Sequence, residues 1–317
     1  MRLAPFVLLL GLGLTSQAHA LVNAIPDRAD RFPFVVEIRF HDDLICSGTV
    51  LFPRIVVTAA HCVQTRGYWR VGRYFTEYLK PSDLTVSVTH HGRTHTHEVI
   101  DVAASPIWQS LSESGSAPGE RFAHDIALII TKEALNVGLP RSLDELAHEE
   151  LIGTKPGLSP VSASIDAERG EMLRTALSKR LKKHGLLVAF GAERCWSRAD
   201  CGEAGIRRYR PVSLKESADC FNDPHGKPRW PPLPDAVAAQ LPLAVWCMES
   251  TVMPGDSGGA LLVESTEGRF YFLGVISAQQ GPVEVAVTAI RRRSLATALY
   301  PSLDFIAEQA RKLGYLP

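Results

Sequence analysis

A serine that stands between glycines late in the chain is the side chain best placed for nucleophilic chemistry. Residues 254–260 read Pro-Gly-Asp-Ser-Gly-Gly-Ala, with Ser257 at the centre. Small neighbours let the backbone turn sharply and let a substrate carbonyl approach the main chain closely, as a hydrolase needs when it presents a reactive hydroxyl. Glycine-rich loops with a serine also occur as plain turns. The motif alone therefore leaves two interpretations open, a nucleophile and a turn.

Two residues far upstream have the chemistry to activate a serine. His61 follows a β-rich run, residues 55–58, through two alanines whose small size lets the chain close into a tight helical turn. Cys62 can tie that turn back to Cys46 and so hold a histidine base in one place. Asp125 stands at the start of an apolar run. An aspartate there is normally a cap or turn residue, but it can also be a buried carboxylate that orients a histidine.

The order of these residues excludes one fold in which a Gly-x-Ser-x-Gly motif carries the nucleophile. In α/β-hydrolases the acid and then the histidine follow the serine along the chain. The last histidine of this chain is His225, which precedes Ser257. An α/β-hydrolase site therefore cannot be assembled in that order.

Composition and charge describe an ordinary globular chain. Of its 317 residues, 45% are hydrophobic and 21% are charged, with 34 Lys and Arg balancing 34 Asp and Glu. A balanced charge gives no basic field to attract nucleic acid or an acidic membrane surface. We therefore expect no nucleic-acid partner.

The first twenty residues have the pattern of a signal peptide. Arg2 supplies the positive start, residues 4–14 are apolar but too short to span a bilayer, and Ala18-His19-Ala20 offers the small residues that signal peptidase requires. We place cleavage after Ala20, although Ser16-Gln17-Ala18 also fits cleavage after Ala18. No later run is apolar for long enough to be a membrane helix. We expect an exported product, secreted or periplasmic, without stable membrane insertion.

Cysteine and histidine usage favours disulfides over metal sites. Six cysteines in an oxidising compartment allow fifteen pairings, and no Cys-x-x-Cys pair is present. Four histidines, at positions 90, 91, 95 and 97, fall in a predicted loop between the β-rich runs 84–88 and 99–102, with Glu98 as the only acidic neighbour. An exposed polar loop is favoured there over a metal site. We expect no metal and no cofactor.

Short β-rich runs separated by turn residues predict antiparallel all-β packing. Residues 46–52 and 55–58 flank Pro53-Arg54 and form a predicted hairpin. Residues 110–120, rich in Ser and Gly, are predicted to be a surface loop. Helical periodicity appears in residues 167–183 and again after Pro301. The further runs that we predict to be strands are residues 34–40, 186–190, 208–214, 241–246, 260–263, 270–277 and 283–290.

Together the motifs resemble a known family. The blocks 57–62 (Val-Thr-Ala-Ala-His-Cys), 124–128 (His-Asp-Ile-Ala-Leu) and 255–259 (Gly-Asp-Ser-Gly-Gly) are similar to the three signature blocks of the trypsin/chymotrypsin-like serine proteases, and they occur in the same order. The resemblance implies an all-β fold of two antiparallel six-stranded β-barrels. Its parts would be an N-terminal barrel at about 21–135, a partly helical insertion at about 136–184, a C-terminal barrel at about 185–300 and a closing helix at about 302–314.

The resemblance also implies an activity, the hydrolysis of peptide bonds in a protein or peptide substrate through an acyl-enzyme. Ser257 is then the nucleophile, His61 the base and Asp125 its orienting acid. Backbone N–H groups of Gly255 and Ser257 form the oxyanion hole. The contrasting class is a non-catalytic binding module on the same fold, although such proteins usually carry a substituted triad.

Specificity departs from the trypsin pattern. The base of the primary pocket falls on Thr251, where trypsin-like enzymes carry an aspartate, so basic side chains lose their partner. Met253 replaces a common pocket cysteine, and Gln279 falls near a wall position that is usually glycine. Ser277 falls where the family has a serine near the triad aspartate, in a segment that also pairs with the substrate backbone. A small or medium uncharged side chain is expected in the pocket.

Two further features follow from the family pattern. Leu21-Val22-Asn23-Ala24 resembles the activated N-terminus of these proteases, whose α-ammonium pairs with the aspartate before the nucleophile, here Asp256. Because Leu21 directly follows the signal peptide, we expect signal peptidase itself to create that terminus. The family implies the disulfides Cys46–Cys62 and Cys220–Cys247, which leaves Cys195–Cys201 as a third pair by elimination.

Overall fold

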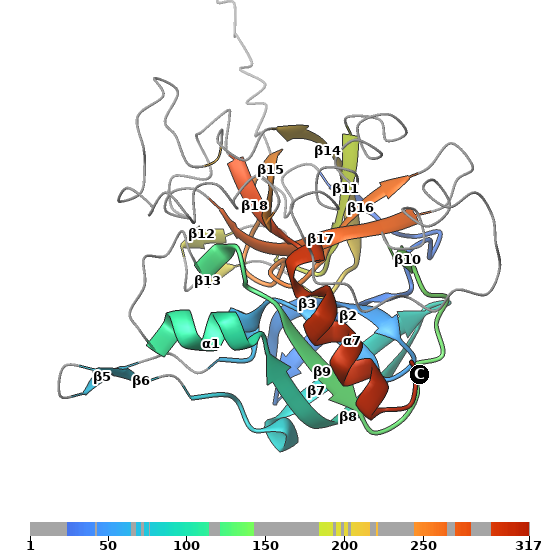
Figure 1. The fold of residues 1–317 in the computed structure, drawn as a ribbon. Coiled ribbons are helices and arrows are strands. Elements are labelled where there is room, and N and C mark those ends of the chain that lie inside the picture. Colours follow the sequence, from blue (N-terminus) through green and yellow to red (C-terminus); the bar gives the residue numbers. More distant parts are fainter. Residues whose placement is uncertain are drawn as a thin grey trace, which may run out of the picture.

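Two closed six-stranded antiparallel β-barrels form the body of the molecule, as the sequence predicts (Figure 1). The strands of the two barrels occupy separate parts of the sequence and lie one above the other in that view. A computed structural model of the chain describes residues 24–41, 43–64, 68–70, 73–75, 77–113, 121–142, 184–192, 195–197, 200–201, 204–215, 220, 244–264, 270–279 and 293–316.

The N-terminal barrel closes in the strand order β2-β3-β4-β9-β8-β7. Strands β4 and β9 are buried along their whole length, so both the inward-facing and the outward-facing side chains of these strands are covered. The predicted hairpin across Pro53-Arg54 is present as the antiparallel pair β3–β4. The strands are β2 (Val35–Phe40), β3 (Asp43–Phe52), β4 (Ile55–Thr58), β7 (Leu84–His90), β8 (Arg93–Ala104) and β9 (Ala127–Thr131).

The predicted histidine loop is wrong. Strands β7 and β8 run almost to the turn, so that His90 ends β7, and His95 and His97 lie on β8. Hydroxyl pairs explain the extension: Ser87 contacts Thr96 at 3.1 Å and Thr89 contacts Thr94 at 2.9 Å across the two strands. Such cross-strand pairs and β-branched threonines favour extended backbone over a loop.

The C-terminal barrel closes through a pairing of β14 with β15, which joins the two ends of the path β14-β11-β16-β17-β18-β15. Two short outer strands extend it: β1 (Ile25–Pro26) pairs with β14, and β10 (Arg141–Ser142) pairs in parallel with β17. The barrel strands are β11 (His184–Ala189), β14 (Arg208–Lys215), β15 (Val245–Glu249), β16 (Ala260–Glu264), β17 (Phe270–Gln279) and β18 (Arg293–Ala298).

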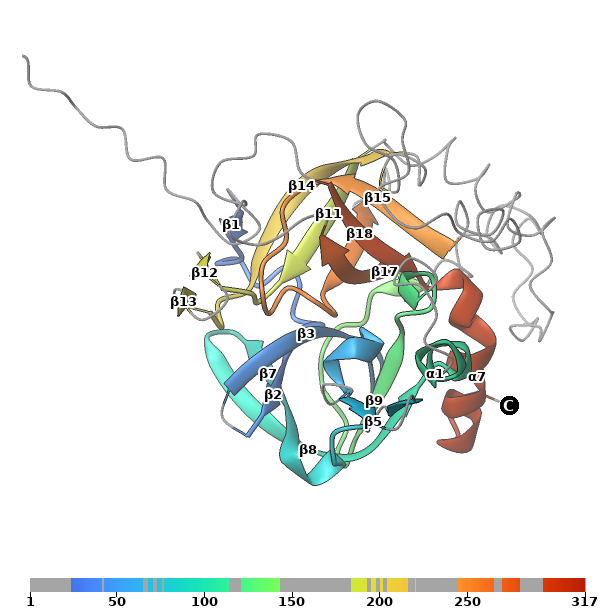
Figure 2. The ribbon, with the colours of Figure 1, turned by 90° about the vertical axis from the view of Figure 1, so that its left-hand side faces the viewer.

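Helix α7 (Leu303–Lys312) is the predicted closing helix, and it lies against the N-terminal barrel although it follows the C-terminal one (Figures 1 and 2). Its buried residues Ile306 and Ala310 belong to the same apolar cluster as the N-terminal barrel interior. Just beyond the helix, the ring of Tyr315 stacks on that of Phe52 in β3, with centroids 5.8 Å apart. The apolar face of α7 therefore completes a barrel built from a distant part of the sequence.

The surface loop predicted at residues 110–120 is wrong at its beginning, where helix α1 (Pro106–Glu113) extends to Glu113. Trp108 is buried, and its indole N–H donates to the side-chain oxygen of Gln64 at 3.2 Å. Anchoring of this large ring outweighs the local preference of the serines for a turn. The helix predicted at residues 167–183 and the strand predicted at residues 283–290 lie outside the described residues, as does the start of the run 241–246, whose end lies in β15.

Short elements complete the described chain. Two small hairpins are formed by β5 with β6 and by β12 with β13. Three single-turn 3₁₀ segments are also present, η1 (Ala60–Cys62), η2 (Pro81–Asp83) and η4 (Tyr300–Ser302). The hairpin strands are β5 (Tyr68–Arg70), β6 (Arg73–Phe75), β12 (Cys195–Ser197) and β13 (Asp200–Cys201).

Disulfides tie local elements to the barrels. Cys46 on β3 is bonded to Cys62 in η1, and Cys220 is bonded to Cys247 on β15, as the family resemblance implies. Cys195 and Cys201 are register partners in the β12–β13 hairpin, and the bond between them stays a prediction.

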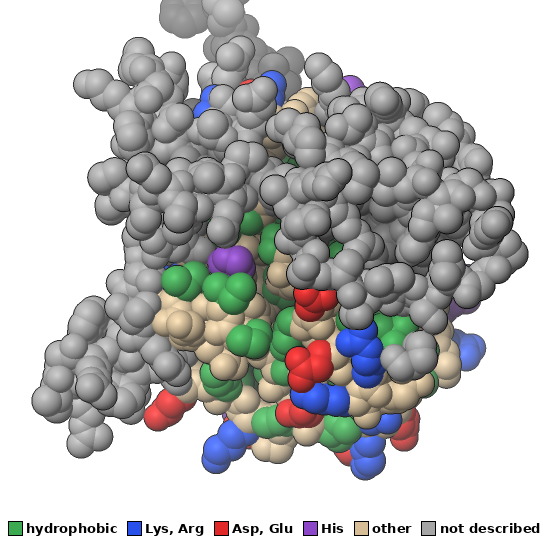
Figure 3. Space-filling model, in the orientation of Figure 1, with side chains coloured by type: hydrophobic (Ala, Val, Ile, Leu, Met, Phe, Trp, Pro, Cys, Tyr) green, Lys and Arg blue, Asp and Glu red, His purple; other side chains and the backbone are tan. Residues whose placement is uncertain are grey.

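The described surface carries charges of both signs. In the view of Figure 3, acidic and basic side chains are interspersed over the N-terminal barrel without a field of one sign, in line with the balanced charge of the sequence. Among the described helices, none has the length and apolar character needed to cross a membrane.

Two isoleucines on paired strands test the barrel core. Ile129 on β9 is 0% exposed, whereas Ile100 on β8 is 48% exposed. We expect Ile129→Ala to lower the free energy of unfolding by about 2–5 kcal/mol, because it leaves a cavity in a close-packed interior. Ile100→Ala, the matched control, should change it by less than about 0.5 kcal/mol. Denaturant unfolding measures both, and equal effects would contradict the described packing.

Candidate active site

His61 and Asp125 meet at one end of the N-terminal barrel because of strand pairing. Thr58, the last residue of β4, is the register partner of Ala127, the first residue of β9. The chain leaving β4 and the chain entering β9 are therefore neighbours, and they carry His61 and Asp125. The His61 ring Nδ1 lies 2.7 Å from Asp125 Oδ2, and the His61 backbone N–H donates to Asp125 Oδ1 at 3.0 Å. These two bonds fix the ring relative to the carboxylate.

The electrostatics of the pair favour an ionised aspartate. Asp125 is 0% exposed, and burial by itself raises the pKa of its carboxyl. The neighbouring His61, with its ring and backbone bonds, and the hydroxyl of Ser277 together outweigh burial, so that the Asp125 pKa is lowered. Burial of the His61 ring lowers its pKa, but the charge and hydrogen bond of Asp125 outweigh that effect and raise it.

Ser277 reaches Asp125 from the other barrel. Its hydroxyl donates to Asp125 Oδ2, and the residue lies at an irregularity of β17 where the register with β18 shifts between Ile276 and Ala278. A β-bulge re-aims one side chain out of the regular alternation. The candidate site therefore draws its aspartate from one barrel and a hydrogen-bond donor to that aspartate from the other.

Ser257 lies in the loop between β15 and β16, which presses directly on the N-terminal barrel. Gly255 and Gly258 have φ values of +92° and +83°, a backbone region that side chains disfavour. A Cβ atom at Gly258 would overlap the backbone oxygen of Ser47 and the hydroxyl of Thr58. Glycine at this position is therefore required by both conformation and space.

Ser47 on β3 makes four hydrogen bonds, and two of them hold this loop in place. Its N–H donates to the carbonyl of Ser257 at 2.7 Å, and its hydroxyl donates to the carbonyl of Gly255 at 2.8 Å. The same hydroxyl accepts the N–H of Phe190 at 2.9 Å, and its carbonyl accepts the hydroxyl of Thr58 at 2.8 Å. Ser47 is fully buried. Ser47 thereby fixes the Ser257 loop against the strand that leads to His61.

Sequence reasoning missed Ser47, although a signal was available. The residue is polar and lies within a strand whose middle is buried, next to the disulfide cysteine Cys46. A buried hydroxyl needs partners, so a serine in such a run points to contacts with a segment distant in sequence.

The backbone N–H groups around Ser257 divide into two sets. Those of Asp256, Gly258 and Gly259 donate to the carbonyls of Met253, Ile276 and Asp256. Those of Gly255 and Ser257 find no acceptor among the described residues. Two backbone donors, one on each side of Asp256, are thus left without an acceptor among the described residues.

Part of the chain matches the model of a known protein family. The model described as Trypsin matches residues 21–150. The match and the two-barrel fold support a serine protease of the chymotrypsin type. The matched segment contains the N-terminal barrel with His61 and Asp125, and the second barrel with Ser257 completes the chymotrypsin-like fold.

The buried Asp256 side chain is bonded to two backbone groups. Its carboxylate accepts the N–H of Gly191 at 3.1 Å and that of Met253 at 2.7 Å. A Cβ atom at Gly191 would overlap the carboxylate, so glycine there makes room for it. Leu21, the expected partner of Asp256, lies outside the described residues.

The predicted pocket residues are only partly described. Thr251 is buried in the segment between β15 and the Ser257 loop, and Met253 is buried beside Asp256. Gln279 ends β17, where its backbone pairs with Ser294 of β18, and its side chain lies outside the described residues. The pocket assignment therefore stays a prediction.

Alanine variants of two buried serines distinguish a role in positioning the Ser257 loop from a role in stability alone. We expect Ser47→Ala to cost about 1–3 kcal/mol of unfolding free energy, because it orphans the Gly255 carbonyl and the Phe190 N–H. It should also lower kcat for peptide hydrolysis by up to about 10²-fold, with little change in KM, because the Ser257 loop loses its position.

The matched control is Ser87→Ala. Ser87 is also buried in the N-terminal barrel, but among the described residues its hydroxyl is bonded to Thr96 alone. Its loss should cost about 0.5–1.5 kcal/mol of stability and leave kcat unchanged. Equal kcat values for the two variants would contradict the positioning role of Ser47.

Proposed function

We propose that the chain is an exported serine endopeptidase that hydrolyses peptide bonds through a His61-Asp125-Ser257 triad. The observation that carries the proposal is the bonded His61–Asp125 pair, with its buried carboxylate, beside a serine loop that Ser47 bonds to the same barrel. A non-catalytic binding module does not require a buried carboxylate such as Asp125 bonded to a histidine ring. The match of residues 21–150 to the Trypsin family model supports the same reaction class.

The chemistry proceeds in two steps, acylation and deacylation. Ser257 Oγ attacks the carbonyl carbon of the scissile peptide bond while His61 Nε2 takes the hydroxyl proton. Asp125 holds Nδ1–H, which fixes the tautomer and stabilises the imidazolium. The intermediate collapses, the C–N bond breaks, and His61 returns the proton to the leaving amine. A water molecule, deprotonated by His61, then releases the acid product from the acyl-enzyme and restores Ser257.

The oxyanion hole is formed in this proposal by the N–H groups of Gly255 and Ser257. Their lack of acceptors among the described residues supports the assignment. Each such donor is worth about 3 kcal/mol in the transition state. The bond from Ser47 to the Gly255 carbonyl fixes the next peptide unit of the loop and so limits its rotation.

Activation and specificity complete the proposal. Signal peptidase cleavage after Ala20 creates a Leu21 α-ammonium that pairs with the buried carboxylate of Asp256. Thr251 at the pocket base and Gln279 at its wall select a small or medium uncharged side chain, and Ser277 contributes to the adjacent substrate-binding segment.

Labelling with a fluorophosphonate probe, read by intact mass, tests the nucleophile and the terminus together. We expect one probe per purified mature chain, no label on Ser257→Ala, and a mass that begins at Leu21. The control Ser302→Ala removes another buried hydroxyl and should label fully. An unlabelled, folded chain that begins at Leu21 would point to a binding module. An unlabelled longer chain would indicate a zymogen, and full activity with another terminus would overturn the Leu21 assignment.

The pH profile tests the charge coupling of His61 and Asp125. His61 must be neutral to accept the proton, so kcat falls as pH drops through its pKa, which Asp125 raises above the ordinary value of about 6.5. Asp125→Asn removes the charge. It should move the acid limb of the kcat profile to lower pH and reduce kcat by about 10⁴-fold. An acid limb at unchanged pH in the variant would refute this coupling.

A further inference from the structure

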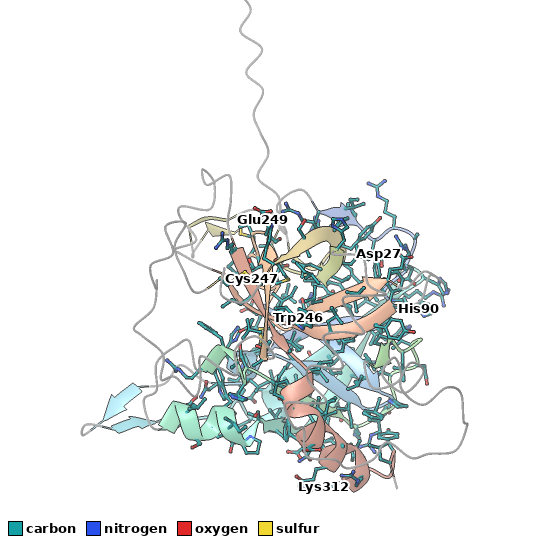
Figure 4. All side chains as sticks on the ribbon, turned by 45° about the horizontal axis from the view of Figure 1, so that its top comes forward. Asp27, His90, Trp246, Cys247, Glu249 and Lys312 are labelled. Atoms are coloured by element: carbon teal, nitrogen blue, oxygen red, sulfur yellow. A yellow bond between two sulfur atoms is a disulfide. The ribbon has the colours of Figure 1, made fainter. Side chains whose placement is uncertain are left out.

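A second group of polar side chains lies where the N-terminal segment meets the β7–β8 hairpin, and it shares no residue with the candidate active site. Asp30 comes from the segment between β1 and β2, His90 ends β7, and His91 begins the turn. Asp27 and His90 mark this edge of the molecule in Figure 4. Asp30 and His91 both have positive φ, 52° and 50°, so the backbone holds each side chain in an uncommon direction.

The two imidazole rings lie close to one carboxylate oxygen of Asp30. Asp30 Oδ2 lies 3.4 Å from His90 Nε2 and 3.7 Å from His91 Nδ1, and the three atoms all lie within 4.8 Å of one another. Ligands about 2.0–2.2 Å from a tetrahedral ion are separated from each other by about 3.3–3.6 Å. The spacing of the carboxylate from each imidazole is thus close to that of a metal site. The two rings stack with centroids 4.0 Å apart, so one of them must rotate for both lone pairs to reach the same ion.

Arg207 bonds to the Asp30 carboxylate at the oxygen that does not face the two histidines. Its guanidinium bonds to Asp30 Oδ1, to Asp27 Oδ2 at 2.8 Å and to the carbonyl of Thr89 at 2.9 Å. The His91 N–H donates to Asp30 Oδ2 at 2.7 Å. An oxygen with two lone pairs keeps one for a further partner. Such outer bonds fix the direction of a ligating carboxylate.

The charge of this group suits a cation. Arg207 is offset by Asp27, which is itself fully buried as a side chain, so the two carboxylates and the guanidinium together leave one negative charge. The two imidazoles add nothing while they are neutral. One carboxylate with two imidazoles is a ligand set that suits zinc and other late first-row ions.

We propose that Asp30, His90 and His91 bind one divalent ion of the zinc class, with water in the remaining position. The His91 side chain is 81% exposed, which leaves that position open to solvent. The ion ties the segment before β2 to the β7–β8 hairpin, and Arg207 carries the connection to the start of β14.

The sequence did not indicate this site because its acid is remote. Asp30 lies 61 positions before His91, whereas the nearest acid along the hairpin is Glu98. Glu98 is instead bonded to Lys132 at 2.7 Å. Local spacing therefore favoured a polar loop.

Zinc titration of the full mature chain, stripped with a chelator and studied at about pH 7.5, tests the site. We expect one equivalent of Zn²⁺ to bind in calorimetry and to raise Tm. His90→Gln/His91→Gln should weaken this binding by at least about tenfold and abolish the rise in Tm, while Tm without zinc stays near that of the parent. Co²⁺ should give the absorption of a tetrahedral site in the parent and lose it in the variant.

The matched control uses the other two histidines of the hairpin. His95→Gln/His97→Gln removes the same number of imidazoles from β8 and should leave zinc binding unchanged. Asp30→Asn should weaken binding as the first pair does, whereas Asp101→Asn, an exposed acid on β8, should not. Zinc binding that survives in His90→Gln/His91→Gln, or that is lost in His95→Gln/His97→Gln, would overturn the proposal.

Discussion

Hydrogen bonding by one buried serine couples the two barrels beside the candidate active site. A buried hydroxyl and its peptide group must find partners, since each unsatisfied polar atom costs about 1–3 kcal/mol. Ser47 satisfies all of its groups with residues from three other segments: the Ser257 loop, the end of β11, and β4. Movement of any one segment breaks bonds to the others, so the relative position of histidine and serine is fixed by packing rather than by local sequence.

Burial of a charge imposes the second constraint. Asp125 is enclosed in the protein, and an isolated carboxylate there would take up a proton. Donors from both barrels prevent this, namely the His61 ring and N–H on one side and Ser277 on the other. An ionised Asp125 therefore requires both barrels in contact, and it in turn keeps the His61 pKa high. Folding and the protonation state of the site are thus linked.

Local patterns predicted the elements well where alternation and turn chemistry act alone. The β3–β4 hairpin followed from Pro53-Arg54 between two β-rich runs, and α7 followed from its apolar spacing after a proline. The order of the sequence motifs indicated His61 and Asp125 as candidate site residues. Helix α1 was missed because serines mask the anchoring of Trp108, a contact with Gln64, 44 positions away. Ser47 and Asp30 act through partners more than 60 positions distant, which no window of sequence reveals.

Two elements near the ends of the described chain each pack on the barrel that the other half of the chain forms. Strand β1, from the N-terminal part of the chain, pairs with β14 of the C-terminal barrel, and α7 packs on the N-terminal barrel. During synthesis on a ribosome, the N-terminal barrel therefore emerges long before the helix that covers its apolar flank. That surface must wait for the whole second barrel to be translated. Each barrel is thus completed by an element from the other half of the described chain.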